Sequence, residues 1–318
     1  MFAYIVRRIL QAIAVVFVIS IVVFILVRCL PGDPIEMYVS QAGLTEITPE
    51  MIEEIRHDKG LDRPWVVQYV DWLGQMLRGD FGVSIMRNFN IANEMQNRVT
   101  VTLLIGLTAF LIGLVVGPLL GIISAIRKGK FVDNLVTVLA NIGVTAPTFW
   151  IAILLIYVFS LHLNWLPLYG YTLPWDNFGE CVKQSIMPVF VTALGPIATT
   201  ARQTRSSVLE VLNEDYVRTA WAKGLNEKKV VFKHVLKNSL MPVVTLQGTM
   251  LRMVVGGSVV VETLFVIPGM GSMMVDAMLS RDYPVIQAVT VVMTIIVVLS
   301  SLIVDLLYAW IDPRIQYD

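Results

Sequence analysis

Six apolar stretches constrain the fold of this chain more than any other feature of its sequence. They cover residues 9–30, 99–126, 134–160, 186–209, 240–267 and 285–310. Each reaches the roughly 20 residues that a helix needs to cross the hydrocarbon core of a bilayer. Hydrophobic residues make up 56% of the 318 residues and charged residues only 15%, against roughly 25% charged in soluble domains. The sequence therefore predicts an all-α polytopic membrane protein with six transmembrane helices.

The first apolar stretch has one feature of a secretory signal, because Arg7 and Arg8 precede it. It is too long for a signal peptide, and no small-residue cleavage site follows Leu30. We therefore expect residues 1–30 to hold a short cytoplasmic end and a retained first transmembrane helix.

The basic residues near the stretch ends predict the orientation, since Lys and Arg are held on the cytoplasmic side. With the N-terminus inside, the cytoplasmic set is Arg7, Arg8, Arg127, Lys128, Lys130, Arg202, Arg205, Arg218, Lys223, Lys228, Lys229, Lys233, Lys237 and Arg314. Both termini are then cytoplasmic. Residues 31–98 form an extracytoplasmic cap, and residues 99–318 form a five-span core with a cytoplasmic loop at 213–238.

The cap is expected to contain two helices. Thr48, Pro49 and Glu50 offer an N-cap, a first-turn proline and an acidic first turn, and Gly60 can end that helix. A second helix is expected from Trp65, with apolar residues at helical spacing on one face. These residues are Val66, Tyr69, Trp72, Leu73, Met76 and Leu77. The helix either lies on lipid headgroups or meets an external partner, and both can hold.

The cytoplasmic loop is expected to begin with a short helix. Asn213 can cap it, Glu214 and Asp215 suit the positive end of its dipole, and Gly224 can end it in the left-handed conformation. Ala220 and Ala222 keep the helix thin, so that another protein can approach its backbone. A docking surface for a soluble protein is one interpretation of this segment.

A second helix is expected after Asn226, with Lys229, Lys233 and Lys237 in one row at i, i+4 spacing. The alternative interpretation of the loop is a basic anchor on anionic lipid. That alternative explains the lysines without explaining Ala220 or Gly224.

Two consecutive runs carry a family resemblance. Asp215-Tyr216-Val217-Arg218-Thr219-Ala220-x-Ala222-Lys223-Gly224-Leu225 and His234-x-Leu236-x-Asn238-x-Leu240-x-Pro242 resemble the permease signature of the dipeptide/oligopeptide/nickel group of ABC importers. Further matching motifs are Pro31-Gly32-Asp33-Pro34, Gly79-Asp80-Phe81-Gly82-x-Ser84, Pro147-x-Phe149-Trp150, Glu262-x-x-Phe265-x-x-Pro268-Gly269-x-Gly271 and Asp282-Tyr283-Pro284. The chain departs from the general importer motif, which has Glu-Ala-Ala where this chain has Arg218-Thr219-Ala220. The peptide branch resembles this chain in that respect.

The resemblance implies a type I ABC importer permease fold and a set of residues that couple the chain to an ATPase. These are Glu214, Asp215, Tyr216, Arg218, Ala220, Ala222, Lys223, Gly224 and Pro242. The implied partners are a second, homologous permease in a heterodimer, two ABC ATPase subunits, an extracytoplasmic solute-binding lipoprotein and membrane lipid, with no nucleic acid. ATP and Mg would be bound by the ATPase subunits, and the location would be the cytoplasmic (inner) membrane of a bacterium or archaeon.

Peptide is the substrate class that the resemblance favours, with nickel or a glutathione-like solute as alternatives. The chain itself has no Gly-x-x-x-x-Gly-Lys-Ser/Thr phosphate loop, so a catalytic role in ATP hydrolysis is not expected. A secondary transporter is the rival from another class, but it predicts inverted repeats and midplane carboxylates, which we do not find. A receptor-like or structural membrane protein is a third reading.

Ionisable residues inside apolar stretches are candidates for the translocation path, because charge is costly at the bilayer centre. Arg252 is the most interior of these residues, and a structural ion pair is its alternative role. Pro147 is also a candidate for the path, and it is expected to break or kink its helix, as are Pro118 and Pro196. Arg28 and Asp305 lie near stretch ends, where their side chains can reach the interface. Cys29 and Cys181 lack a metal-ligand spacing and are read as packing residues, and no metal site is expected.

Overall fold

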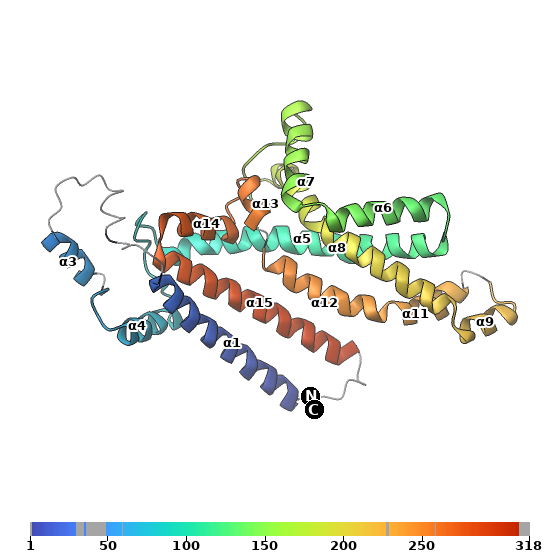
Figure 1. Ribbon diagram of the computed structural model, residues 1–318, viewed down its shortest axis with the longest axis horizontal. Coiled ribbons are helices and arrows are strands. Elements are labelled where there is room, and N and C mark those ends of the chain that lie inside the picture. Colours follow the sequence, from blue (N-terminus) through green and yellow to red (C-terminus); the bar gives the residue numbers. More distant parts are fainter. Residues whose placement is uncertain are drawn as a thin grey trace. The chain divides into compact units, whose positions relative to one another are not determined.

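The computed structural model describes residues 2–29, 35, 49–58, 60–226, 229–257 and 259–311. Apart from one isolated bridge between Val83 and Asn90, the regular structure in these ranges is helical (Figure 1). The predicted all-α fold is thus confirmed. The motif at residues 31–34, the expected N-cap Thr48, and Lys228 and Arg314 lie outside the described residues.

The chain forms two compact units. The first unit contains residues 1–100 and 268–309, and the second contains residues 101–267. Helices of the first unit are α1 (Phe2–Arg28), α3 (Pro49–Asp58), α4 (Trp65–Leu77), α14 (Met270–Ser280) and α15 (Tyr283–Ile311). Helix α5 (Ile91–Ile126) begins in the first unit and continues in the second.

In the first unit, α1 and α15 lie side by side (Figure 1), and an ion pair of 3.3 Å joins Arg8 to Asp305. Apolar residues of α1, α5, α14 and α15 form its core. The most buried of them are Val27, Ile91, Met95, Met270, Met273, Ala277, Val285, Ala288 and Val289. Asp305, expected near a stretch end, therefore pairs within the chain.

The two cap helices confirm their predicted starts, at Pro49 and Trp65, and Gly60 has the expected positive φ of 65°. The predicted face of α4 is only partly right. Tyr69 and Trp72 pack on α1, with ring centroids 5.2 Å and 6.1 Å from that of Phe24, whereas Val66 and Leu77 are exposed. Helix α4 therefore has an aromatic inner face and an apolar outer face.

A buried carboxylate holds the segment after α4. Asp282, just before α15, accepts hydrogen bonds from the hydroxyl of Ser84, from the backbone N–H of Ile85 at 3.2 Å and from that of Met86 at 3.5 Å. Asp282 and Ser84 are 3% and 2% exposed. Two of the motifs noted in the sequence, around Gly79–Ser84 and Asp282–Pro284, thus meet in space.

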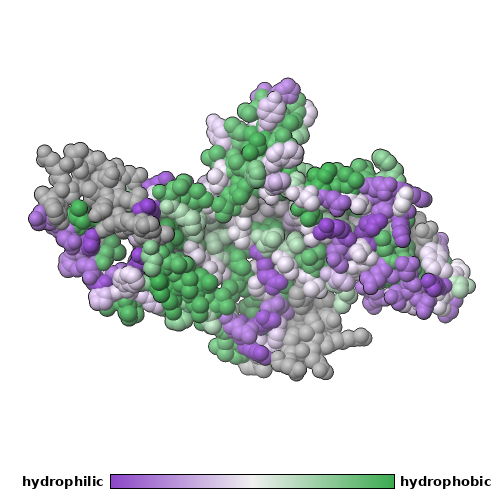
Figure 2. Space-filling model, in the orientation of Figure 1, coloured by the Kyte–Doolittle hydropathy of each residue, from purple (hydrophilic) through white to green (hydrophobic). Residues whose placement is uncertain are grey.

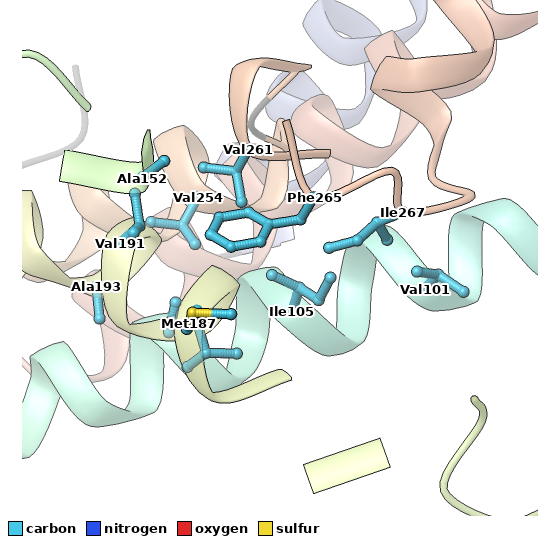
Figure 3. Packing of buried hydrophobic residues seen from close by; sticks show 12 residues of the cluster. Val101, Ile105, Ala152, Met187, Val191, Ala193, Val254, Val261, Phe265 and Ile267 are labelled. Carbon is cyan, nitrogen blue, oxygen red and sulfur yellow. The ribbon is translucent and has the colours of Figure 1, made fainter. Parts of the chain in front are cut away.

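The second unit is built on α5 and α8 (Phe178–Leu212). Its other helices are α6 (Phe131–Thr145), α7 (Thr148–Leu155), η1 (Ile156–His162), α9 (Asp215–Ala222), η2 (Val230–Val235), α11 (Leu236–Ser239), α12 (Met241–Val255) and α13 (Val259–Leu264). Val254, Val261 and Phe265 meet Ile105 of α5 and Met187 of α8 in its main apolar core (Figure 3).

Small residues bring α5 and α8 close together. A Cβ added at Gly117 would lie 2.7 Å from Cβ of Thr200, and one at Gly121 would lie 2.5 Å from the carbonyl oxygen of Ala201. Close backbone approach at glycine is a common way to pack helices in membranes, where van der Waals contact drives association.

Four helices are long and apolar enough to cross a membrane: Tyr4–Arg28, Ile91–Ile126, Phe178–Leu212 and Tyr283–Leu306. A fifth span exists if the pair Phe131–Thr145 and Thr148–His162, bent by 107°, counts as one. The stretch predicted over 240–267 contains α12, which has 15 residues, and the separate α13. The number of six spans stays a prediction.

The 107° bend lies at Pro147, as expected. Ala146 has an extended backbone with ψ of 132°, which is the conformation that a following proline favours because its ring excludes the helical one. Pro118 and Pro196 lie inside α5 and α8, and neither breaks its helix.

Candidate functional site: the loop between α8 and α12

Helix α9 begins one residue later than expected. Its N-cap is Glu214, which has extended backbone with ψ of 146°, whereas Asn213 is helical and ends α8. The side-chain amide of Asn213 donates to the carbonyl oxygen of Leu209 at 2.9 Å. The prediction that Asn213 caps the loop helix is wrong, because a capping residue needs the extended conformation that Asn213 lacks.

Gly224 ends α9 as predicted, with a φ of 71°. Its N–H donates to the carbonyl oxygen of Trp221 at 2.9 Å, and the N–H of Leu225 donates to that of Ala220 at 3.4 Å. No atom lies within 4 Å of the position that a Cβ of Gly224 would take. Backbone conformation alone, rather than crowding, therefore favours glycine here.

Ala220 does not present the thin outer surface that the sequence suggested. Its side chain is 5% exposed, and Val217 on the same face of α9 is fully buried. Both belong to one apolar core with residues of η2, of the C-terminal end of α5 and of the C-terminal part of α8. The residues of this core, which we call the loop core, are Ala125, Val208, Val217, Ala220, Val230, Val231, Val235 and Leu236. A small residue at 220 thus serves packing inside the chain, while Ala222 is exposed.

The outer face of the loop carries aromatic and charged side chains. Tyr216, Trp221 and Phe232 are 41%, 42% and 72% exposed. Glu214, Asp215, Arg218 and Lys223 are exposed as well. Figure 2 shows hydrophilic side chains gathered where α9 lies in Figure 1. Sequence reasoning missed Trp221 and Phe232, although large aromatic residues within a charged segment were the available signal.

The second loop helix differs in type from the expectation. Residues 230–235 form a π-helix turn, followed by the short α11. Lys229, Lys233 and Lys237 are all exposed, as the predicted row requires. The carbonyl oxygen of Asn226 accepts from the N–H of Val230 at 3.1 Å, so the helix begins near the expected residue.

A polar contact joins the two halves of the loop. The side-chain amide of Asn238 donates to the hydroxyl of Tyr216 at 2.8 Å. Both residues belong to the signature runs noted in the sequence. Arg218 and Asp215 form an exposed ion pair of 3.6 Å within α9, a kind of pair that contributes little to stability.

An ion pair with a buried carboxylate lies in the same unit. Arg205 of α8 donates from Nε and Nη2 to the two carboxylate oxygens of Asp133 at 2.7 Å and 2.9 Å. Ser124 and the N–H of Gly129 also donate to Asp133, at 2.5 Å and 2.8 Å. This carboxylate therefore fixes the turn between α5 and α6 to α8. Sequence reasoning missed Asp133, although an acidic residue among basic ones marked the turn.

The remaining predicted site residues lie outside the loop core. Pro242 is exposed in the first turn of α12. Arg252, further along α12, donates to the hydroxyl of Thr249 at 3.3 Å, and within the described ranges it forms no ion pair. Pro147 stands at the break between α6 and α7. The structure thus brings the loop residues together, but not Arg252 or Pro147 with them.

The geometry defines an all-helical, multi-pass membrane protein with a folded loop between two of its core helices. Residues 117–317 match the family model described as binding-protein-dependent transport system inner membrane component, and residues 1–106 match the model of its N-terminal region. The chain belongs to this family of ABC importer permeases.

Individual relatives agree with this assignment. The chain is 42% identical over 320 residues to the oligopeptide transport system permease protein AppB of Bacillus subtilis (strain 168), covering 100% of both chains. It is 40% identical over 319 residues to a putative peptide permease protein of Brucella suis biovar 1 (strain 1330), covering 99% of both.

A solved structure shows the same fold. The chain matches a structure titled as an inward-facing conformation of the MetNI methionine ABC transporter, with a TM-score of 0.55 and 18% identity. The match covers 69% of this chain and 96% of the other. At this identity the likeness confirms the type I permease fold alone.

Proposed function

We propose that this chain is the permease subunit of an ATP-driven importer that carries peptides into the cytoplasm. Support for the substrate class comes from full-length relatives that are named as oligopeptide and peptide permeases.

The loop at 213–238 is the proposed docking site for the ATPase, and the loop core is the observation that carries the proposal. Tyr216, Trp221 and Phe232 are exposed on the same loop whose other side chains form a buried apolar core. That core includes Val208 of α8 and Ala125 of α5. A displacement of α9 is therefore passed to two long helices rather than absorbed in a flexible connection.

Among the coupling residues, the outer positions are Glu214, Asp215, Tyr216, Arg218, Ala222 and Lys223. Gly224 sets the end of α9, Ala220 holds α9 against η2, and Pro242 lies in the first turn of α12. A lipid anchor would account for the lysine row and for exposed aromatic side chains. It would not need α9 to pack into an apolar core with Val208 of α8 and Ala125 of α5.

The proposed mechanism is alternating access. Two ATPase subunits bind ATP and Mg, and their closure moves the loops of this chain and of a second, related permease. The membrane helices then change between outward-open and inward-open arrangements. Arg252, which donates only to Thr249 among the described residues, and Pro147 at the 107° bend are proposed to line the path.

The proposed orientation places both termini and the loop in the cytoplasm. The cap then lies outside, where a solute-binding lipoprotein delivers the peptide. In support, the basic residues Arg127, Lys128 and Lys130 occur in a single short turn on the same unit as the loop.

The test compares two alanines on opposite faces of α9. Ala222→Arg places a long charged side chain on the exposed face, so we expect normal membrane insertion and an unchanged unfolding temperature. Retention of the ATPase subunits during gentle purification and ATP-driven peptide uptake should both fall at least about tenfold, since a charge buried without a partner at an interface costs more than 1.4 kcal/mol.

Ala220→Arg and Asn97→Arg are the matched controls. Ala220→Arg should lower the unfolding temperature as well, because the charge enters the loop core. Asn97→Arg lies at an exposed position in the first unit. It should change neither the unfolding temperature nor the retention of the ATPase subunits and peptide uptake. Wild-type uptake by Ala222→Arg would show that the outer face of α9 is not a docking surface.

A further inference from the structure

Helix α4 packs against the last turns of α1, and its contacts fix the level at which it lies. Oε1 of Gln68 accepts from Nη2 of Arg28, the last residue of α1, at 2.8 Å. About one turn earlier on α1, the ring centroid of Phe24 lies 5.2 Å from that of Tyr69. A further turn back, the hydroxyls of Ser20 and Tyr69 share a hydrogen bond of 2.8 Å. Helix α4 therefore lies across the last two turns of α1 rather than beyond its end.

The length of α1 places this level at the boundary of a bilayer. The helix Tyr4–Arg28 has 25 residues and is thus about 37 Å long at about 1.5 Å per residue. A hydrocarbon core is about 30 Å thick, so the helix exceeds it by about 4 Å at each end when the excess is shared. Ser20 then lies about 8 Å inside the core surface. Helix α4 therefore lies where headgroups give way to acyl chains.

The side chains of α4 fall on three faces, as the period of about 3.6 residues per turn requires. The inner face carries Tyr69 and Trp72, which pack on Phe24. An apolar face on one side of it consists of Val66, Val70, Leu73 and Leu77. Val66, Val70 and Leu77 are 74%, 59% and 78% exposed. A polar face on the other side consists of Gln68, Asp71 and Gln75.

The contacts with α1 show which of these two outer faces points toward the bilayer centre. Gln68, on the polar face, reaches Arg28 at the end of α1. Tyr69 borders the apolar face, because it lies three residues from Val66 and four from Leu73. Its hydroxyl reaches Ser20, about two turns deeper on α1. The polar face thus points out of the membrane, and the apolar face points along α1 into it.

We propose that the apolar face of α4 rests in the acyl chains of the leaflet at the Arg28 end of α1. Insertion of one apolar face is the usual way in which an amphipathic helix binds a bilayer surface. The only charged residue of α4 is Asp71, and it lies on the polar face, paired with Arg63 at 3.2 Å. The bilayer then holds α4 level and carries the cap at the membrane surface.

Lipid and a soluble protein are the two occupants that an exposed apolar face could have. A soluble partner approaches from the water, so a face that points toward the bilayer centre is out of its reach. Lipid is also continuous with the neighbouring surface, because Val18, Ile25 and Leu26 of α1 are exposed aliphatic residues. Acyl chains that cover this side of α1 therefore meet the apolar face of α4 as well.

The test measures the depth of single spin labels on the full-length chain in phosphatidylcholine nanodiscs, with Cys29→Ser and Cys181→Ser as the background. A label at Val70→Cys should collide with oxygen, which concentrates among acyl chains, and not with a water-soluble nickel chelate. A label at Gln75→Cys, on the polar face of the same helix, should show the reverse. Val18→Cys of α1 is the lipid reference, and Glu54→Cys of α3 is the water reference.

Two outcomes would overturn the proposal. One is a label at Val70→Cys that meets the nickel chelate as freely as the label at Glu54→Cys. The other is a label at Val70→Cys that is shielded from both reagents, which would assign the apolar face to a protein contact.

A charge on each face gives a second readout. Val70→Asp should raise the rate of trypsin cleavage at Arg78, the residue after α4, about tenfold in the same nanodiscs, because an ionised carboxylate is expelled from acyl chains. Gln75→Asp places the same charge on the polar face and should leave the cleavage rate at its wild-type value. Equal rates for Val70→Asp and Gln75→Asp would mean that both faces meet the same surroundings, which contradicts the proposal.

Discussion

The cap segment of the first unit and the loop of the second are held to their membrane helices by different forces. In the cap, hydrogen bonds to buried polar groups add to the aromatic packing of α4 on Phe24: Asp282 accepts from three donors, and Ser20 of α1 bonds to the hydroxyl of Tyr69 at 2.8 Å. In the loop, Val217, Ala220 and their neighbours form an apolar core, and one exposed hydrogen bond joins Tyr216 to Asn238.

The difference has a mechanical consequence. Hydrogen bonds to a carboxylate are directional, so they fix the orientation of the cap segment and fail together when the carboxylate is removed. Apolar contacts are non-directional, and their free energy is spread over many side chains. A loop of this second kind can tolerate small shifts at its surface and still pass a displacement to its helices, which is what the proposed coupling role requires.

The largest effect should come from Asp282→Ala. It leaves the hydroxyl of Ser84 and the N–H groups of Ile85 and Met86 without their acceptor in a buried site. We expect a loss of about 4–5 kcal/mol, since hydrogen bonds to a charged group are worth at least about 1.5 kcal/mol each and three are lost together. The unfolding temperature in detergent and protease cleavage within residues 81–90 are the measurements.

Asp282→Asn is the matched variant for this site. It keeps a carbonyl oxygen that can accept from one or two of the donors, so it should lose about half as much stability. Equal stability of Asp282→Ala and the wild type would mean that the cap segment is held by its apolar contacts. The contrast between the two regions would then be lost.

Local features of this fold could be predicted from the sequence, and long-range ones could not. The starts of α3 and α4, the ends at Gly60 and Gly224 and the break at Pro147 depend on the backbone preferences of single residues, which a sequence displays directly. The meeting of Ser84 with Asp282 joins residues 198 positions apart. No local preference marks such a contact.

The errors at the candidate site have the same origin. Asn213 and Glu214 can both cap a helix by composition, and the end of α8 decides between them by making Asn213 helical. Ala220 and Ala222 are the same residue type two positions apart, and only packing against Val230 and Val235 shows that one is inside. Burial is a tertiary property, so the sequence predicted the short helix α9 but assigned one of its faces wrongly.

A smaller effect is expected at Gly224, where the loop depends on its backbone rather than on its core. Gly224→Val puts a β-branched residue at a φ of 71°, which costs about 1–2 kcal/mol. The space around the glycine is open, so no clash adds to this strain. We expect a modest fall in unfolding temperature with a larger loss of ATPase retention, because the chain leaves α9 in the wrong direction.

Gly224→Asn separates conformation from side-chain size. Like valine, asparagine adds a bulky side chain in place of glycine, but it adopts the left-handed conformation readily. It should keep most of the ATPase binding that valine loses. If asparagine and valine were equally harmful, the bulk of the side chain at the docking surface would be the cause, and the argument from φ would fall.

The smallest effect should come from Tyr216→Phe, which removes the hydroxyl that accepts from Asn238 and leaves the aromatic ring in place. The bond lies at an exposed position, where water can replace the lost partner, so the stability should fall by only about 0.5–1 kcal/mol. The loop core below is unchanged, and we expect peptide uptake close to that of the wild type. Asn238→Ala should have the same small effect, and the double variant should be no worse than either single one, because the two residues share one interaction. A fall in unfolding temperature as large as that of Asp282→Ala would contradict this view. It would show that a polar contact, rather than the apolar core, holds the loop to its helices.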